Sequence, residues 1–347
     1  MKVVQIPEQS FEVGFRYIKS VRLGEEVCTY QSIIKDYPVG RKPPTVDMRN
    51  GNTLVQYIKP NSSINDKLAG RLWYVGSKAR SLNGARAATS FTDKAELAVR
   101  FAMVALCPDK SGATSIEIEN LHTSLPVNGE FDDVLVQRIK EALEGTHVFL
   151  RNGKKIEATV GNVQVSPEGY GSYLTVANHH PELLAESGYT GILDLGGKTA
   201  NLVLVDPDGD YIPDATYSFE TGGTYSLALA ISNEYRLKHS CRGALDLNLF
   251  MDAIASQSLI YGAKRSFAGE YEYCLKAWFD GILGEIESRW QTYLSQIGKI
   301  LVTGGSAALV DPFLADSEGL MSIVPNFQTA SCQGLISPNP FVLSKAA

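Results

Sequence analysis

The chain has 347 residues and a net charge of −6, with 44% hydrophobic and 20% charged residues. These values are typical of a globular protein and exclude a disordered, collagen-like or low-complexity chain. The acidic balance argues against a protein that coats nucleic acid by charge alone. No run of about 18 apolar residues predicts a membrane span, and the length suits about two domains.

The cysteines show no pattern that predicts a cross-linked or metal-bound protein. The five cysteines are widely spaced and include no CxxC pair; they are Cys28, Cys107, Cys241, Cys274 and Cys332. This spacing predicts neither a disulfide framework nor a zinc site, and it favours a reducing cytosol. The first nine residues lack an apolar core followed by small residues, so we expect no export signal and a cytoplasmic protein.

The first half of the chain combines short strands with amphipathic helices. Residues 91–106 carry apolar side chains at helical spacing behind the cap candidates Thr92 and Asp93, so they predict a helix. Residues 131–143 predict a second helix by the same spacing. Breaks rich in Gly, Pro and Asn separate the expected strands, which are 2–6, 13–22, 26–33 and 73–75.

The next part of the chain contains a hairpin signal, and after it the pattern changes to alternating strands and helices. Asn152-Gly153 lies inside the alternating segment 147–165 and predicts a β-hairpin. From residue 190 onward, apolar strands and long helices follow one another, which is typical of an α/β unit. The expected strands are 191–195, 202–205 and 299–303, and the expected helices are 223–237, 245–261 and 271–294.

A glycine-rich turn, Asp194-Leu195-Gly196-Gly197-Lys198-Thr199, joins two of these strands. Its end resembles a P-loop, but that motif needs a glycine five residues before Gly197, and Ile192 stands there. A P-loop must also be followed by a helix, whereas the next segment predicts a strand. The alternative is a hairpin whose backbone N–H groups approach phosphate oxygens, with Asp194 holding Mg²⁺ through water. We favour the hairpin.

This hairpin resembles the second phosphate loop of the actin-like ATPases, a superfamily that includes actins, sugar kinases and large heat-shock chaperones. Residues 11–19 resemble the superfamily's first phosphate loop, with Gly14 and Lys19 at matching positions and Glu12 where aspartate is usual. Residues 300–308 resemble its strand and glycine turn that pack against adenosine. Taken singly, each motif is more typical of an ordinary tight turn, so their joint order carries the resemblance.

Within the superfamily, the closest resemblance is to the plasmid-segregation filament proteins of the ParM/StbA group. It rests on a Pro-Glu-Gly turn, a glycine turn before a helix and a closing segment, at 163–171, 219–224 and 326–335. The resemblance implies an α/β, actin-like (ribonuclease H-like) two-domain fold with an interdomain nucleotide cleft. It implies domain I at 1–185, with 335–347 returning to it, and domain II at 186–334.

The resemblance also implies roles for individual residues. Glu168 would be catalytic, because a carboxylate at this turn suits the orientation or activation of attacking water. Glu12 and Asp194 would hold hydrated Mg²⁺. The implied nucleotide-binding residues are Gly14, Phe15, Arg16, Tyr17, Lys19, Asp194, Gly196, Gly197, Lys198, Thr199, Gly222, Gly223, Lys264, Gly304, Gly305 and Ser306.

The implied function is that of a prokaryotic filament protein that binds ATP or GTP with Mg²⁺, hydrolyses it and segregates plasmid DNA. Its implied partners are further copies of itself and a DNA-bound adaptor protein, with no direct nucleic-acid or membrane contact. Arg16 and Lys198 stand where small residues are usual, and they would either clamp a phosphate or fill its place. Two alternatives stay open: a small-molecule kinase of the same superfamily, and a non-catalytic adaptor or assembly regulator.

Overall fold

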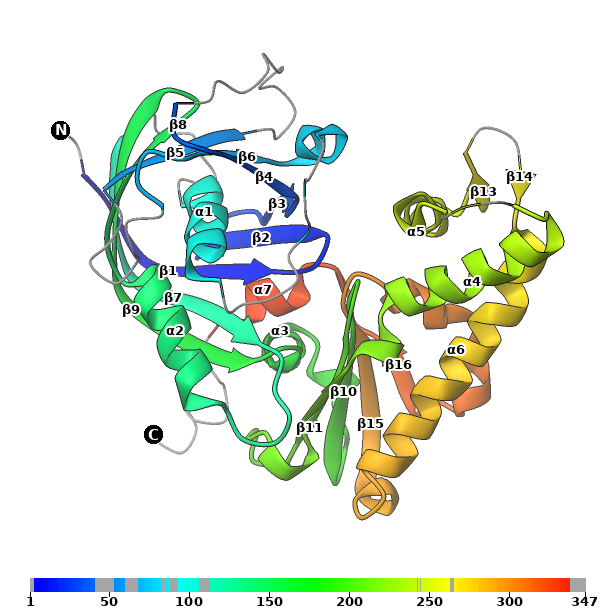
Figure 1. Cartoon of the computed structure of the whole chain (residues 1–347). Helices are drawn as coiled ribbons and strands as arrows, with labels where there is room; N and C mark the ends of the chain where they lie inside the picture. Colours follow the sequence, from blue (N-terminus) through cyan, green and yellow to red (C-terminus); the bar gives the residue numbers. More distant parts are fainter. Residues whose placement is uncertain are drawn as a thin grey trace. The chain divides into compact units, whose positions relative to one another are not determined.

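The computed structural model describes residues 3–40, 53–59, 68–82, 85, 87, 93–105, 113–241, 243, 245–262 and 265–337 (Figure 1). Contacts divide the chain into two compact units. Unit 1 holds the described residues of Met1–Leu125, Phe131–Pro167 and Cys332–Pro338, and unit 2 holds those of Pro126–Glu130 and Glu168–Ser331. The domain limits expected from the sequence stay a prediction, because units defined by contacts need not coincide with domains.

Unit 1 is built on one mixed sheet. Its strands are β1 (Val3–Val13), β2 (Tyr17–Arg22), β3 (Cys28–Gln31), β4 (Ile34–Tyr37), β5 (Thr53–Lys59), β6 (Leu72–Val75), β7 (Ser115–Leu125), β8 (Gly145–Arg151) and β9 (Lys154–Pro167). They lie in the order β3-β2-β1-β7-β9-β8-β5-β6-β4. The central pairs β1–β7 and β7–β9 are parallel. The sheet curls around helix α1 (Lys94–Val104), and helix α2 (Asp133–Leu143) packs against α1 (Figure 1).

Helix α1 forms the centre of the unit 1 core. All its residues from Glu96 to Val104 are buried, as expected of a helix that a curled sheet encloses. The Phe101 ring lies 5.7 Å from that of Phe11 on β1. The Asp93 carboxylate accepts hydrogen bonds from the first amides of α1, so this predicted N-cap is confirmed, whereas Thr92 lies outside the described residues.

Two strand predictions in unit 1 had different outcomes. The predicted hairpin at Asn152-Gly153 is confirmed, since both residues have positive φ (52° and 82°) and join the antiparallel strands β8 and β9. The single strand expected over 13–22 is wrong, because β1 ends at Val13 and β2 begins at Tyr17. The break between them is the turn that the first phosphate-loop resemblance implied.

One prediction about the cysteines is also wrong. Cys28 on β3 forms a disulfide bond, whereas Cys241, Cys274 and Cys332 are free thiols. Cys107 lies outside the described residues. Wide spacing along the chain does not exclude a disulfide, because an S–S bond depends on the distance between the two cysteines in the fold.

His147 on β8 is a buried, neutral imidazole in the unit 1 core. Its Nε2 lies 2.8 Å from the Leu143 carbonyl oxygen, and its Nδ1 lies 3.3 Å from the Tyr57 hydroxyl. The Phe101 ring is 5.3 Å away. Burial lowers the pKa of His147 to about 4. The folded protein therefore resists protonation at pH values where an exposed imidazole accepts a proton.

We expect His147 to make unit 1 less stable as the pH falls from about 6.5 to about 4. In that window only the unfolded chain binds the proton, so the free energy of unfolding decreases, by about 3 kcal/mol in total. Urea unfolding at pH 7 and pH 4.5 measures this loss. The loss should shrink in His147→Gln and persist in the control His179→Gln, whose side chain is exposed. Equal pH dependence in His147→Gln and the unmodified protein would contradict the assignment.

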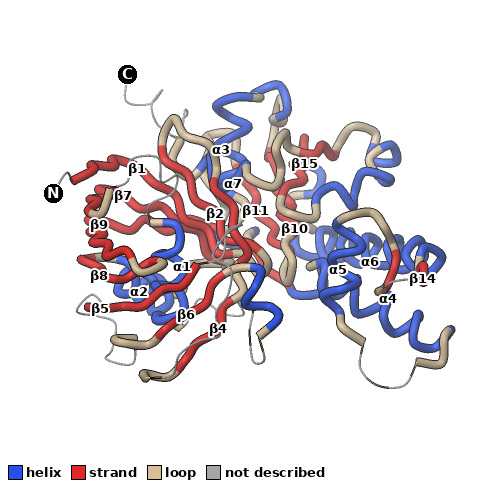
Figure 2. Tube along the Cα trace, turned by 90° about the horizontal axis from the view of Figure 1, so that it is seen from above, coloured by secondary structure: helices blue, strands red, loops and turns tan. Residues whose placement is uncertain are grey.

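Unit 2 is an α/β unit. Its strands β10 (Tyr189–Leu195), β11 (Ala200–Val205), β12 (Tyr217–Phe219), β15 (Ile297–Thr303) and β16 (Met321–Ile323) form a sheet in the order β12-β11-β10-β15-β16. The larger helices are α3 (Tyr170–His179), α4 (Thr224–Lys238), α5 (Leu247–Ala255) and α6 (Ala268–Arg289). Helix α4 lies beside α5 and α6 (Figures 1 and 2). A short helix, α7 (Ala330–Gly334), follows the last strand.

Two helices of unit 2 depart from their predicted limits. The helix expected over 245–261 ends at Ala255, because Gln257 and Leu259 adopt positive φ (55° and 50°). Residues Ile260–Tyr261 then form the small strand β13, which pairs with β14 (Arg265–Ser266). Helix α6 begins three residues before its predicted start and ends before Trp290.

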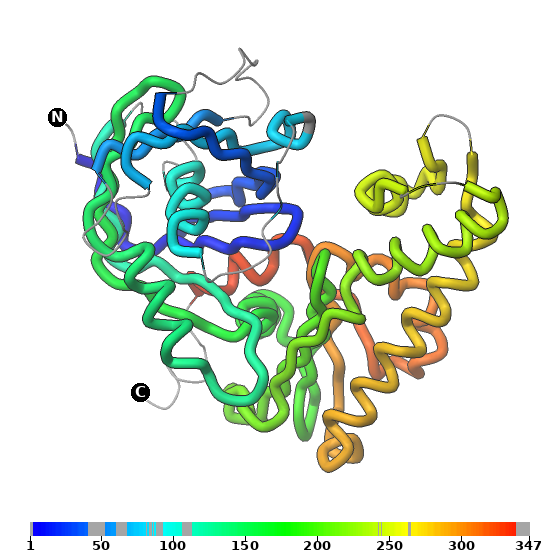
Figure 3. Tube along the Cα trace, in the orientation of Figure 1, coloured from blue at the N-terminus to red at the C-terminus, as the bar shows by residue number. Residues whose placement is uncertain are grey.

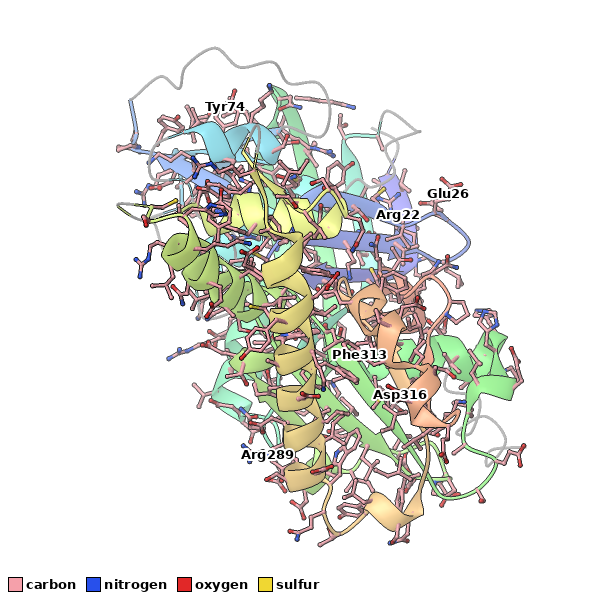
Figure 4. The ribbon with its side chains drawn as sticks, turned by 90° about the vertical axis from the view of Figure 1, so that its right-hand side faces the viewer. Arg22, Glu26, Tyr74, Arg289, Phe313 and Asp316 are labelled. Carbon is pink, nitrogen blue, oxygen red and sulfur yellow. The ribbon has the colours of Figure 1, made fainter. Side chains whose placement is uncertain are left out.

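Contacts at the middle and at the C-terminal end of the long helix α6 fix it in unit 2 (Figure 4). The Phe313 ring stacks on that of Phe279 at 4.5 Å, and the Arg289 guanidinium lies 4.9 Å from the Tyr217 ring centroid. The Trp290 indole N–H donates a 2.8 Å hydrogen bond to the Ala215 carbonyl. The contacts of Arg289 and Trp290 hold the end of α6 against the sheet edge that carries β12.

The closing segment of the chain passes from unit 2 into unit 1 at Cys332. After β16 the chain enters α7 (Figure 3), and residues 332–337 group with unit 1. There the Cys332 Sγ lies 2.9 Å from the Ser10 Oγ on β1. No helix in the described part of the chain has the length and apolar character that a membrane crossing requires.

Candidate functional site

The glycine turn of unit 2 is a tight hairpin between β10 and β11. The strands pair in a register that places Asp194 opposite Asn201, and the Gly196 N–H donates a 2.9 Å hydrogen bond to the Thr199 carbonyl. Strand β11 follows the turn directly. A P-loop would require a helix at that point, so the hairpin interpretation applies.

Helix α4 begins on this turn. The N–H groups of Thr224 and Tyr225 donate to the carbonyls of Gly196 (3.2 Å) and Gly197 (2.8 Å). No side chain caps α4, so the turn satisfies amides that lack a partner within the helix. These two amides are thus occupied by the protein itself.

Gly222 and Gly223 permit this close packing. A Cβ at Gly223 would lie 2.2 Å from the Lys198 carbonyl, and one at Gly222 would lie 2.4 Å from the Ala200 Cβ. Both distances are far shorter than any contact that real Cβ atoms make. The absence of a side chain at these two glycines therefore lets the start of α4 pack closely against the β10–β11 hairpin.

Ser306 connects the third glycine turn to the same hairpin. Its N–H donates to the Leu195 carbonyl at 3.0 Å, and its hydroxyl lies 3.4 Å from the Gly196 carbonyl oxygen. The hydroxyl also contacts that of Thr224. The hairpin, the start of α4 and the turn after β15 are thus one hydrogen-bonded assembly.

Two carboxylates meet beside this assembly. The Asn201 Nδ2 donates to Glu168 Oε2 at 2.9 Å and to Asp194 Oδ2 at 3.4 Å. Asn201 is 3% exposed, whereas Glu168 and Asp194 are half-buried. Gly169 lets Glu168 approach Asp194, because it adopts φ 93°, which side chains rarely allow. A Cβ at this position would also lie only 3.2 Å from the Asp194 Cβ. Unit 2 therefore brings together the residues expected for water activation and metal binding.

Gly304 lies directly against the Asp194 carboxylate. It has φ +88°, and a Cβ built there would lie 2.1 Å from Asp194 Oδ1 and 2.6 Å from the Leu195 carbonyl oxygen. By contrast, a Cβ at the neighbouring Gly305 meets nothing within 4 Å. Only the first glycine of this pair is required for the position of Asp194.

We expect Gly304→Ala to displace the Asp194 carboxylate and Gly305→Ala to leave it in place. The alanine methyl at position 304 needs space that Asp194 occupies and a φ that L-residues rarely adopt. Binding of a Mg²⁺–nucleotide analogue should weaken roughly tenfold or more, with a loss of stability of about 1 kcal/mol or more. Calorimetric titration and thermal unfolding of both variants measure these effects. Equal binding by the two variants would contradict this role of Gly304.

Lys198 is paired within unit 2. Its ammonium lies 2.7 Å from Glu220 Oε1, and the two side chains are 36% and 71% exposed. A pair this exposed contributes little stability, about 0–1 kcal/mol. An anionic ligand with better geometry would therefore displace Glu220 from Lys198 at small cost.

The first glycine turn, in unit 1, is a second tight hairpin. The Gly14 N–H donates to the Tyr17 carbonyl at 2.8 Å. Glu12 and Lys19 are opposite one another on β1 and β2, and the Lys19 Nζ lies 3.7 Å from Glu12 Oε2. Ser124 on β7 donates to Glu12 Oε1 at 3.3 Å. Lys19, expected to bind phosphate, and Glu12, expected to bind the metal, thus contact each other.

Ser32 fixes the tip of this hairpin. Its hydroxyl donates to the Phe15 carbonyl at 2.8 Å, and its N–H donates to the Arg16 carbonyl at 2.9 Å. The Arg16 guanidinium lies 5.8 Å from the Tyr17 ring centroid. With both carbonyls of the tip engaged by Ser32, the backbone of the hairpin is held in one conformation.

The expected residues therefore fall into one cluster in each unit. In unit 1 these are Glu12, Gly14, Phe15, Arg16, Tyr17 and Lys19, and in unit 2 they are Glu168, Asp194, Gly196, Gly197, Lys198, Thr199, Gly222, Gly223, Gly304, Gly305 and Ser306. Lys264 lies outside the described residues. Sequence reasoning missed Asn201, Ser32 and Thr224, although Asn201 stands directly after the glycine turn.

The carboxylates suit a metal ion that is held through water. Within the described ranges, no group of three or more His, Cys, Asp or Glu side chains is placed to hold a metal ion. Mg²⁺ binds proteins through few carboxylates and keeps several of its waters. The carboxylates of Glu168 and Asp194 can accept hydrogen bonds from metal-bound water, so they fit a hydrated Mg²⁺ better than a directly coordinated ion.

Two family models match successive parts of the chain. Residues 12–171 match the model described as the N-terminal domain of actin-like proteins. Residues 192–316 match the C-terminal model of the archaeal actin homologue MreB-like. No curated protein matches the chain. The two models contain the first and second hairpins, respectively.

Solved structures with the same fold match over nearly the whole chain. The archaeal actin homologue Ta0583 has 14% identity and a TM-score of 0.74, covering 99% of this chain and 100% of its own. ParM from a Clostridium botulinum filament has 13% identity, a TM-score of 0.74 and coverage of 96% and 98%. Bacillus thuringiensis ParM with AMPPNP has 16% identity, a TM-score of 0.66 and coverage of 98% and 99%. Ta0583 has also been solved with ADP. These likenesses confirm the expected α/β, actin-like two-domain fold.

Proposed function

Because this chain belongs to the actin-like superfamily, we propose that it binds ATP with Mg²⁺, hydrolyses it and polymerises into filaments. The observation that carries this proposal is the cluster of Glu168, Asp194 and Asn201 beside the β10–β11 hairpin. The proposal extends to plasmid or other DNA segregation in the cytoplasm of a prokaryote, with a DNA-bound adaptor protein as partner.

Nucleotide binding is supported by the two hairpins and by the fold. Backbone N–H groups of Phe15 to Tyr17 and of Gly197 to Thr199 would donate to phosphate oxygens, whereas those of Gly14 and Gly196 close the two hairpins. Lys19 would add a point charge to the phosphates if its 3.7 Å contact with Glu12 opens. Gly304, Gly305 and Ser306 would line the adenosine. Among proteins of this fold, Ta0583 and B. thuringiensis ParM have been solved with ADP and AMPPNP.

Hydrolysis is supported by the carboxylate cluster. Glu168 would accept a proton from the attacking water, and its 2.9 Å bond to Asn201 keeps the carboxylate oriented. Asp194, with Glu12 from the other hairpin, would bind the waters of a hydrated Mg²⁺. When bound, Mg²⁺ supplies neutralisation of charge on the β- and γ-phosphates. GTP fits the same phosphate contacts.

Self-assembly is supported by the likeness to ParM in a 15-stranded filament. A head-to-tail contact that does not close into a ring builds an open filament from one type of chain, without a second protein. Contact with DNA through an adaptor is consistent with the net charge of −6, because direct binding of a phosphate backbone draws on clustered Lys and Arg.

The test is to pellet the purified protein with Mg²⁺-ATP, with Mg²⁺-GTP and without nucleotide, while phosphate release is followed in the same samples. We expect nucleotide-dependent pelleting followed by phosphate release. A matched sample with EDTA should show neither. Phosphate transfer to a small acceptor without pelleting would favour the kinase alternative. Failure to bind any nucleotide would favour the non-catalytic adaptor or regulator.

A further inference from the structure

Asn201 is the one member of the carboxylate cluster to which sequence reasoning gave no role. Its side chain is 3% exposed, at the start of β11 and opposite Asp194. Its Nδ2 reaches Glu168 Oε2 at 2.9 Å and Asp194 Oδ2 at 3.4 Å. One carboxamide thus contacts both the water-activating and the metal-binding carboxylate of the proposed site.

The orientation of this carboxamide is fixed by chemistry. Ionised carboxylates only accept hydrogen bonds, so the NH₂ end of Asn201 must face Glu168 and Asp194. The consequence is that Asn201 Oδ1 is buried without a hydrogen-bond partner. Native proteins retain few buried acceptors of this kind, and those retained call for an explanation in function or bound water.

We propose that Asn201 is a positioning residue that clamps Glu168 to Asp194. This inference rests on the proposed hydrolysis of nucleotide. Two carboxylates that share a site repel each other, and a neutral donor that bonds to both holds them at a fixed separation. Without the clamp, Asn201 no longer sets the separation of Glu168 and Asp194. The Glu168 carboxylate then no longer meets a water that is held in a fixed position relative to Mg²⁺.

The clamp predicts a loss of turnover with little change in binding. In Asn201→Leu, which removes both hydrogen bonds at similar volume, kcat should fall roughly tenfold or more. The affinity for Mg²⁺-AMPPNP should change less than about threefold, because no phosphate contact is removed. Asn201→Asp keeps the shape but replaces the donor with an acceptor, so its kcat should fall at least as far.

Two controls separate clamping from a general structural role. Asn178→Leu removes a half-buried amide of α3 that donates to the Leu174 carbonyl at 2.8 Å, and it should leave kcat unchanged. In a Glu168→Gln background, Asn201→Leu should cause no further loss, because Asn201 acts through Glu168. The proposal would be overturned if the fall in kcat of the double variant equalled the product of the falls in the two single variants. Full turnover in Asn201→Asp would overturn it as well.

A measurement without nucleotide distinguishes failure of the clamp from failure of the proposed function. Asn201→Asp places a third carboxylate beside Glu168 and Asp194, so its Tm should fall by several degrees. Adding Glu168→Gln removes one of those charges and should restore most of the Tm. A wild-type protein that releases no phosphate would overturn the hydrolytic function and, with it, the positioning role. An active wild type with no recovery in the double variant would overturn the clamp alone.

Discussion

We expect Asp194→Ala to weaken Mg²⁺-nucleotide binding by roughly 100-fold or more, because it deletes a charge that Mg²⁺-bound water would contact. Gly304 packs against this carboxylate and Asn201 bonds it, so its position in the cluster is fixed by both. Calorimetric titration with Mg²⁺-AMPPNP measures the loss.

The matched control is Asp280→Ala on α6, where a 56% exposed carboxylate pairs with Lys276. It should bind the nucleotide as the unmodified protein does. Thermal unfolding of both variants checks that each one folds. Normal binding and normal phosphate release in Asp194→Ala would defeat the assignment of this site.

The second large effect is expected from Glu168→Gln, which should reduce kcat roughly 100-fold and leave Mg²⁺-AMPPNP affinity within about threefold. Glutamine preserves the length of the side chain and can still accept the hydrogen bond from Asn201 Nδ2. It cannot take the proton of the attacking water. Phosphate release at saturating ATP measures kcat.

Glu182→Gln serves as the control, since this side chain is 67% exposed and pairs only with the ring of His180 among the contacts described. Its turnover should equal that of the unmodified protein. If Glu168→Gln also turns over normally, another group accepts the proton. If it fails to bind nucleotide, Glu168 acts in binding rather than in catalysis.

The fold and the outline of the site followed from local signals in the sequence. Asn152-Gly153 specified its hairpin because both residues accept positive φ. Asp93 specified the start of α1 by its capping side chain. The glycine turns were recognisable since their order along the chain resembles that of actin-like proteins, and two family models match those regions.

Features that depend on distant segments were not predictable in this way. Strand β7 was missed because its burial alternation changes phase, with Ile118 buried, Glu119 exposed and then Leu121 buried, so no single period of two runs through it. The contact between Asn201 and Glu168 joins residues 33 positions apart. Ser32 likewise supports a turn 16 residues before it. The residues around Ser32 contain no pattern that would indicate this role.

The way in which α4 begins has a consequence for the order of folding events. Its first amides find their acceptors in Gly196 and Gly197, and 28 residues separate Thr224 from Gly196. A helix nucleus is costly to form alone, and here the first turn lacks any local cap. We therefore expect the N-terminal turn of α4 to form only once the β10–β11 hairpin supplies these acceptors, which makes this end of the helix a late-forming part of unit 2.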